Sequence, residues 1–325
     1  MTQLAPKVAV ERLQSALGPS GTLDINPDAD RIWSKSELIE RLREGNYDGL
    51  YCMLTNPIDG EVLDAAPNLK IIANMAVGFN NIDVKEATRR GIAISNTPGV
   101  LTDTTADFAW TLIMASARRL VESDRFLRAG RFHGWGPLMM VGNDVHGKTL
   151  GIIGFGRIGR AVAKRATGFD MSVLYHDKYA ADPDTERALN ARSVSMDELL
   201  SQSDFVTIHT DYNPETHHLI GAPQLATMKP TAHLINTARG PIVDEVALAS
   251  ALKDGTIAGA GLDVYEREPQ VHPALFALEN VVLAPHIASA SLDTRNSMAL
   301  TAADNILAAL RGERAPDCVN PEVYN

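Results

Sequence analysis

One glycine-rich stretch constrains the fold of this chain more than any other feature. The apolar run Thr149–Ile153 leads directly into Gly154-x-Gly156-x-x-Gly159, and the residues that follow have helical spacing. The glycine spacing alone is weak evidence, but here it follows a predicted strand, opens a predicted helix and precedes an acidic residue, Asp177, at the end of the next strand. This context is typical of a β-α-β unit that binds the pyrophosphate of a dinucleotide.

There is a physical reason for each glycine of this loop. Gly154 permits a tight turn, Gly156 lets the backbone approach the pyrophosphate, and Gly159 lets the helix lie close to the strand. Asp177 is placed to accept hydrogen bonds from the adenosine ribose, where it would repel a 2′-phosphate. The sequence therefore favours NAD over NADP, although the neighbouring His176 and Lys178 leave NADP possible.

The rest of the chain alternates predicted strands with predicted helices, which is typical of α/β folds with parallel sheets. Its 325 residues suggest two domains. Apolar runs of strand length lie at 7–10, 49–54, 70–74 and 92–95, with helical patterns at 36–42 and 83–87. A second series of strands is predicted near 149–153, 171–176, 204–209, 232–236, 257–262 and 281–284, as in a doubly wound sheet.

Three further segments have a distinctive pattern. A long helix is predicted over 102–120, and because its interior is apolar nearly all round, we expect it to be buried between layers or between subunits. Glycines and a proline break regular structure at 130–137, whose aromatic residues suggest either a contact arm or a packed loop. The helix predicted over 294–310 is amphipathic.

Composition excludes several classes of protein. Thirty basic residues against forty acidic ones give a net charge of −10, which argues against a nucleic-acid-binding protein but not against a small anionic substrate. Two distant cysteines argue against a disulfide scaffold or a cysteine zinc site and suit a reducing compartment. With no signal peptide or membrane-spanning segment recognisable, we expect a cytoplasmic protein. The adjacent His217 and His218 would point apart on a rigid element, so no metal site is predicted.

Several strands end in polar residues, at the edge where doubly wound sheets bind ligands. These segments are 233–240, 261–269 and 281–289, and further distinctive segments are 77–83, 96–107 and 293–298. Together and in this order, they resemble the D-isomer-specific 2-hydroxyacid dehydrogenase family over nearly the whole chain. Within that family, the sequence is most similar to the glyoxylate/hydroxypyruvate reductases.

The resemblance implies catalytic roles that suit the chemistry of each residue. Arg239 would bind the substrate carboxylate and polarise the adjacent carbonyl, and the backbone N–H groups of Val77 and Gly78 would complete the carboxylate site. His286 would protonate the carbonyl oxygen during reduction and accept the proton during oxidation. Glu268 would orient the imidazole and favour its protonated form.

The resemblance also implies a cofactor site. Asp263 and the backbone near Thr237 and Ala238 would orient the nicotinamide amide, while Thr105, His209 and Thr210 would lie along the cofactor. The full set of expected cofactor-binding residues is Thr105, Gly154, Phe155, Gly156, Arg157, Ile158, Gly159, Asp177, His209, Thr210, Pro214, Thr216, Thr237, Ala238, Arg239, Asp263, His286 and Ala288.

The implied architecture has two doubly wound parallel-sheet domains. A Rossmann dinucleotide-binding domain (103–291) would be inserted in a flavodoxin-like substrate-binding domain (1–102 and 292–325). The active site would lie in the cleft, with domain closure excluding water.

The implied activity is reversible, NAD(P)H-dependent reduction of a small 2-keto acid, of the glyoxylate or hydroxypyruvate type, to the D-2-hydroxy acid by a homodimer. One alternative is a 2-ketogluconate reductase, whose pocket would differ in size. Another is a non-enzymatic dinucleotide sensor resembling transcriptional corepressors of the same fold. The presence of Arg239, Glu268 and His286 favours an enzyme.

Overall fold

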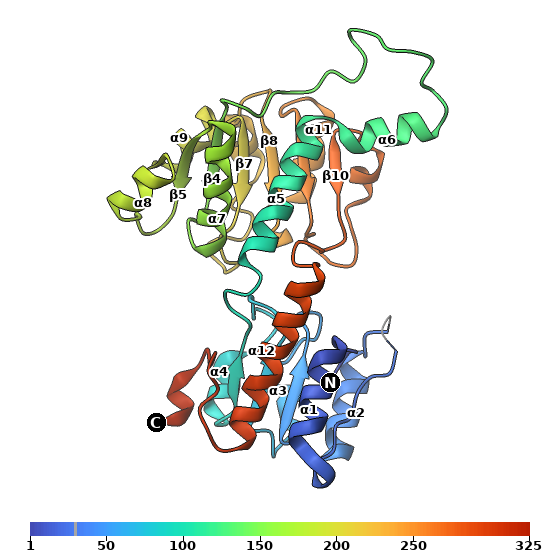
Figure 1. Ribbon diagram of the computed structural model, residues 1–325, viewed down its shortest axis with the longest axis vertical. Coiled ribbons are helices and arrows are strands. Elements are labelled where there is room, and N and C mark those ends of the chain that lie inside the picture. The colour runs from blue at the N-terminus through green and yellow to red at the C-terminus, as the bar shows by residue number, and fades with distance from the viewer. Residues whose placement is uncertain (29–30) are drawn as a thin grey trace. The chain divides into compact units, whose positions relative to one another are not determined.

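The chain divides into two compact units. A computed structural model describes residues 1–28 and 31–325 (Figure 1). One unit comprises Met1–Leu101 and Ala290–Asn325, and the other comprises Thr102–Ser289. The assignment of the substrate to the first unit and the dinucleotide to the second remains a prediction.

The larger unit contains a seven-stranded sheet in the described residues. Its neighbouring strands all pair in parallel, in the order β10-β9-β8-β7-β4-β5-β6. The strands are β4 (Thr149–Ile153), β5 (Ser172–His176), β6 (Ala191–Ser193), β7 (Phe205–Ile208), β8 (His233–Asn236), β9 (Gly259–Leu262) and β10 (Val281–Leu283). Strand order reverses between β4 and β7, so the loop after β4 lies at the switch point where α/β sheets bind ligands.

The expected α/β class with parallel sheets is confirmed, and the second series of predicted strands corresponds to β4, β5 and β7–β10. The prediction of six strands was wrong by one, because β6 was missed. That strand has only three residues, Ala-Arg-Ser, and it lies at the edge of the sheet with little of its surface buried. A short, polar edge strand has no apolar pattern by which it can be recognised.

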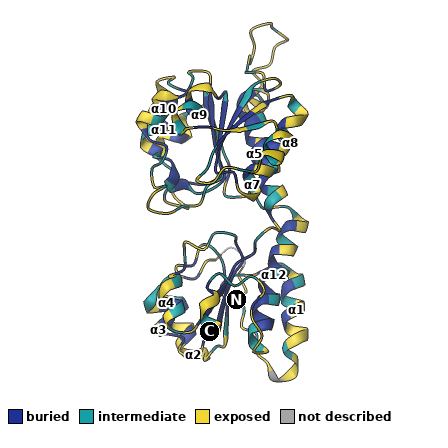
Figure 2. Cartoon of the chain, turned by 90° about the vertical axis from the view of Figure 1, so that its left-hand side faces the viewer, coloured by how far each residue is buried: buried dark blue, intermediate teal, exposed yellow. Residues whose placement is uncertain are grey.

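Helices cover both faces of this sheet, as Figure 2 shows. On one face lie α5 (Thr102–Ala117), α7 (Arg157–Ala166) and α8 (Pro183–Ala188), and on the other lie α9 (Met196–Gln202), α10 (Ala222–Thr227) and α11 (Glu245–Lys253). Short 3-10 turns are formed by Thr167–Phe169, Gly240–Ile242 and Pro273–Ala277. The central strands β7, β8 and β9 are therefore buried along their whole length.

The helix predicted over 102–120 is shorter than expected. It ends at Ala117, and Arg119 adopts a left-handed backbone (φ 52°) before α6 (Leu120–Arg128) begins. As predicted, α5 is buried, with Ile113 fully enclosed among side chains of the sheet and α7. After α6, the chain runs as a long loop away from the body of the unit (Figure 1).

The smaller unit has a three-stranded parallel sheet, in the order β1-β2-β3, among its described residues. Helices α1 and α12 lie on one face and α2, α3 and α4 on the other (Figure 2). The bounds are α1 (Lys7–Leu17), α2 (Lys35–Gly45), β1 (Gly49–Cys52), α3 (Gly60–Asp64), β2 (Ile71–Asn74), α4 (Val84–Arg89), β3 (Ala93–Ser95) and α12 (Leu292–Leu310), with 3-10 turns at Gly18–Ser20 and Pro321–Tyr324.

The strand predicted at 7–10 was wrong, since these residues begin α1. The buried residues of this helix, Ala9 and Leu13, are four positions apart and therefore share one helical face. The apolar run was thus the first turn of a longer helical pattern. Within the part of the chain that the structure describes, none of the helices combines the length and apolar character needed to cross a bilayer.

Candidate active site

The glycine loop is closely packed at two of its glycines and open at the third. Gly154 has φ 90°, and a Cβ there would lie 2.5 Å from the backbone N of Thr210, which follows β7. A Cβ on Gly159 would lie 2.2 Å from the carbonyl oxygen of Gly154, whereas one on Gly156 would meet nothing within 4 Å. Gly156 is also the N-cap residue of α7, so the open space lies at the positive end of a helix, as an anionic pyrophosphate requires.

Asp177 is held at the mouth of this loop by two backbone hydrogen bonds. The N–H of Phe155 donates to Oδ2 (2.6 Å) and the N–H of Tyr179 donates to Oδ1 (3.0 Å). Each carboxylate oxygen can accept more than one hydrogen bond, so the carboxylate can also accept bonds from ribose hydroxyls. The position of Asp177 is consistent with binding of the adenosine ribose, and this role remains a prediction.

The loop after β7 carries several of the expected cofactor residues. His209 Nε2 lies 2.9 Å from the hydroxyl of Thr207, and burial lowers the pKa of His209 to about 3, so this imidazole is neutral near pH 7. The hydroxyl of Thr216 accepts a hydrogen bond from the N–H of Asn213 (2.9 Å), which closes the turn that contains Pro214. Thr105 is buried in the first turns of α5.

Arg239 follows β8 on a braced turn. The side chain of Asn236 accepts a hydrogen bond from the N–H of Ala238 (3.0 Å) and donates one to the carbonyl of Arg239 (2.9 Å). Burial lowers the pKa of Arg239, while the nearby carboxylates of Glu268 and Asp211 raise it. A guanidinium stays charged despite such a shift, so this turn presents a fixed positive charge.

The buried hydroxyl of Thr237 has no hydrogen-bond partner among the described residues. A buried polar atom without a partner is rare in folded proteins and is often satisfied by a ligand or water. Together with the open space at Gly156, this hydroxyl fits a dinucleotide along the carboxyl edge of the sheet. Bound there, the group would supply or accept a hydride.

His286 and Glu268 form a hydrogen-bonded pair at the same edge. Nδ1 of His286 lies 2.8 Å from Oε2 of Glu268, and the other carboxylate oxygen accepts the N–H of Tyr265 (3.0 Å). Burial raises the pKa of Glu268, but the hydrogen bond and charge of His286, the Tyr265 N–H and the charge of Arg239 outweigh it, so the net pKa is lowered. Glu268 is therefore an anion facing the imidazole, whose Nε2 remains for a substrate.

The backbone of His286 is strained and is held by Asp263. Its φ of 56° lies in the left-handed region, which costs a non-glycine residue on the order of 1–3 kcal/mol. The carboxylate of Asp263, fully buried at the end of β9, accepts the N–H groups of Ile287 and Ala288 at 2.7 Å each. Burial raises the pKa of Asp263, whereas these two bonds and the charge of His286 lower it. The geometry gives Asp263 a structural function beside its predicted contact with nicotinamide.

In the smaller unit, the predicted residues Val77 and Gly78 follow β2. The side chain of Asn96 donates to the carbonyl of Val77 (2.7 Å), and that of Asn74 donates to the carbonyl of Gly78 (3.0 Å). Because C=O and N–H point in opposite directions in a trans peptide, the bond from Asn96 also fixes the direction of the Gly78 N–H. Their participation in substrate binding remains a prediction.

The structure thus brings Arg239, Glu268 and His286 to one edge of one sheet, on the loops after β8, β9 and β10. Sequence reasoning missed Glu245, whose carboxylate binds the loop that carries Glu268. The signal in the sequence for this role of Glu245 was weak, because an acidic residue in the first turn of a helix is common.

The expectation that His217 and His218 point apart was wrong. Their rings stack with centroids 4.0 Å apart, because His218 has a left-handed backbone (φ 49°) in a turn rather than a regular element. In the described part of the chain, the structure has no cluster of three or more residues able to hold a metal ion.

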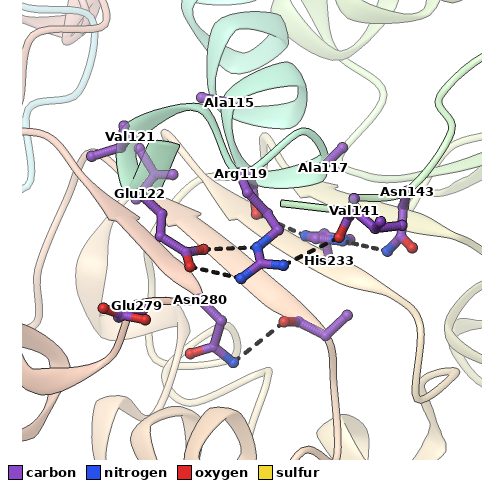
Figure 3. Close-up of a pocket in the computed structure, with 14 residues that line it drawn as sticks. Ala115, Ala117, Arg119, Val121, Glu122, Val141, Asn143, His233, Glu279 and Asn280 are labelled. Carbon is purple, nitrogen blue, oxygen red and sulfur yellow. Dashed lines mark hydrogen bonds and ion pairs between the residues drawn. The ribbon is translucent and has the colours of Figure 1, made fainter. Parts of the chain in front are cut away.

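One cavity of about 310 Å³ lies away from these residues (Figure 3). Its lining includes His233 and Val282, near the start of β8 and β10, whereas Arg239 and His286 follow the other ends of these strands. Ser116 Oγ and Asn143 Nδ2 lie 2.7 and 2.9 Å from the two ring nitrogens of His233, and burial lowers the pKa of this histidine to about 4. The cavity therefore belongs to the opposite edge of the sheet.

A glycine loop with open space at the start of a helix and a histidine–carboxylate pair, both at the carboxyl ends of strands in one parallel sheet, are typical of dinucleotide-dependent oxidoreductases. Residues 110–288 match the family described as D-isomer specific 2-hydroxyacid dehydrogenase, NAD binding domain. The chain belongs to this family and is an oxidoreductase that uses NAD(P).

Relatives and solved structures agree with this assignment. The chain is 56% identical over 293 residues to a glyoxylate reductase of Korarchaeum cryptofilum. The aligned region covers 89% of this chain and 87% of the relative. It is similar to the crystal structure of a glyoxylate reductase from Paecilomyes thermophila (TM-score 0.85, 37% identity, 97% and 95% covered). It is also similar to an NADPH-dependent glyoxylate/hydroxypyruvate reductase from Sinorhizobium meliloti (TM-score 0.83, 33% identity, 99% and 96% covered).

The glycine geometry yields a paired prediction. Gly156→Ala adds a methyl group to open space, so we expect little change in melting temperature but at least about 10-fold weaker NADH binding, because the methyl occupies the pyrophosphate site. The control, Gly159→Ala, adds a methyl against the carbonyl of Gly154 and should destabilise the protein by about 1–3 kcal/mol. Calorimetry and NADH fluorescence titration measure both. If Gly156→Ala bound NADH as tightly as the unchanged protein, the placement of the pyrophosphate beside Gly156 would be contradicted.

Proposed function

We propose that this chain reduces glyoxylate or hydroxypyruvate with NAD(P)H to the corresponding D-2-hydroxy acid, and that it also catalyses the reverse reaction. The observation that carries the proposal is the 2.8 Å contact between His286 and Glu268 at the sheet edge that also carries Arg239. The names of the relatives, which are glyoxylate and hydroxypyruvate reductases, support this choice of substrate.

The residues divide the chemistry between them. The guanidinium of Arg239 binds the substrate carboxylate and draws electron density from the adjacent carbonyl. Nε2 of His286 donates a proton to the carbonyl oxygen as the carbonyl carbon is reduced. Glu268, bonded to Nδ1, keeps the ring oriented and stabilises its cationic form before this transfer. In the reverse direction, Nε2 accepts the proton.

We propose a preference for NADH over NADPH. Asp177 is fixed beside the glycine loop by the N–H groups of Phe155 and Tyr179, so its negative charge cannot easily move away from a 2′-phosphate.

We further propose a cytoplasmic homodimer. In the segment after α5, the side chains of Leu127, Trp135 and Leu138 are 59%, 81% and 88% exposed, which is costly unless a partner covers them. Both cysteines are free, as a reducing compartment requires. Sedimentation should give twice the 35.1 kDa of one chain, and a monomer at micromolar concentration would contradict the dimer.

The role of His286 predicts a kinetic defect without a binding defect. His286→Ala removes the proton donor, so kcat for glyoxylate should fall by about 10²–10⁴-fold while NADH binding stays nearly unchanged. Steady-state kinetics and fluorescence titration measure the two effects, with His146→Ala, an exposed histidine that precedes β4, as the control. A variant that turns over at the full rate would remove His286 from this role.

The role of Asp177 predicts a change in cofactor selectivity. Asp177→Ala removes the charge that opposes a 2′-phosphate, so the ratio of kcat/KM with NADH to that with NADPH should fall by about 10-fold. Because the ratio is compared, any loosening of the Phe155 N–H affects both cofactors alike. Asp184→Ala, on the exposed surface of α8, is the control. An unchanged ratio in Asp177→Ala would show that another group selects the cofactor.

A further inference from the structure

Glu245 is a buried carboxylate that has no place in the proposed chemistry. It is the first residue of α11 and only 6% exposed. A buried carboxylate is costly unless it is well paired. Its oxygens bind two backbone groups: the N–H of Glu266 donates to Oε1 (2.6 Å) and the N–H of His272 donates to Oε2 (3.1 Å).

These two N–H groups lie on either side of Glu268. One precedes it by two residues and the other follows it by four, so a single carboxylate fixes both ends of the loop Glu266–His272. The middle of this loop, Arg267–Gln270, is exposed, and the N–H of Gln270 donates to the carbonyl of Arg267 (2.9 Å) within it. The backbone that carries Glu268 is therefore held at both ends of its loop, while the Glu268 side chain also accepts the N–H of Tyr265.

The same arrangement occurs on the other side of the pair. Asp263 binds the N–H groups of Ile287 and Ala288 and so fixes the loop that carries His286. Each member of the His286–Glu268 pair is thus carried by a loop that a different buried carboxylate holds by two N–H groups. The two carboxylates come from different elements, β9 and α11.

We propose that Glu245 is a positioning residue for the proton transfer: by binding Glu266 and His272, it keeps the carboxylate of Glu268 against Nδ1 of His286. This inference rests on the proposed roles of Glu268 and His286. Without Glu245, the loop would remain folded for part of the time, but Glu268 would contact the imidazole less often, and the imidazole would be a weaker base.

Other charges that act on the pair would stay in place. Arg239 approaches Glu268 from the end of β8, and Asp263 acts on His286 from the end of β9. Asp211 acts on Arg239 from the loop after β7. Glu245→Gln leaves these groups in place but removes one negative charge near the loop, whereas His272→Pro keeps that charge. A shift of the pH profile that both variants share would therefore report on the Glu268 contact.

The test compares two variants that break the same interaction from opposite sides. Glu245→Gln replaces one acceptor oxygen with an NH₂ group that cannot accept a backbone N–H. His272→Pro removes one of the donors, and the φ of −57° at His272 is compatible with a proline ring. Asp244→Ala is the control: it removes the N-cap of the same helix, where Asp244 binds the N–H groups of Val246 and Ala247, and leaves the loop bonds intact.

We expect both loop variants to lose about 10-fold in kcat/KM for glyoxylate and to shift the alkaline limb of that profile to lower pH by about half a unit. The dissociation constant for NADH should be unchanged, and amide exchange over residues 266–272 should be faster. Asp244→Ala should lose about 1 kcal/mol of stability with an unshifted profile.

Two results would overturn the proposal. One is an unshifted profile in folded Glu245→Gln and His272→Pro, and the other is an equal shift in Asp244→Ala. His286→Ala, assayed in parallel, separates this inference from the function on which it rests. If that variant is slow and the loop variants have normal profiles, only the role of Glu245 fails, whereas a fast His286→Ala contradicts the proposed chemistry itself.

Discussion

The contact between the imidazole of His286 and the carboxylate of Glu268 depends on the loops that carry these two residues. Backbone N–H groups of both loops bind buried carboxylates, which holds the two side chains close together. Neither residue lies in a regular element, and His286 has a left-handed backbone that it would not adopt unaided. The contact persists because buried carboxylates bind the N–H groups of the flanking residues. Desolvated carboxylates form strong hydrogen bonds with backbone N–H groups, and these bonds offset the free-energy cost of burying the charge.

The parallel sheet brings the candidate site residues together. Residues far apart in sequence, such as Asp177 and His286, both follow the carboxyl ends of strands in the same sheet. The glycine loop lies where the strand order reverses, and Gly154 approaches the backbone of Thr210 so closely that no side chain fits. The topology of the sheet therefore places the residues proposed for phosphate binding and for proton transfer along the same ends of its strands.

Much of this arrangement could be predicted from the sequence. Glycine spacing after an apolar strand predicted the loop. The polar ends of β8, β9 and β10 indicated where a ligand would bind, and the family resemblance supplied the residues of the candidate site. The elements that were not predicted correctly lack a clear periodic pattern of apolar residues. Ala191–Ser193 is too short and polar to be recognised as a strand, and Lys7–Val10 was too short a window to reveal its helical period. Glu245 looks like an ordinary residue of a first helical turn, and only the folded chain shows that it binds a loop that begins 21 residues further on.

A crystal structure with NADH and oxamate, a non-reducible analogue of a small 2-keto acid, would test the central claim most directly. We predict that the oxamate carboxylate binds the guanidinium of Arg239 while its amide carbonyl oxygen accepts a hydrogen bond from Nε2 of His286, with Nδ1 still on Glu268. The pyrophosphate should lie against Gly156. Oxamate bound beyond hydrogen-bonding reach of His286, or a dinucleotide bound away from the glycine loop, would contradict the account.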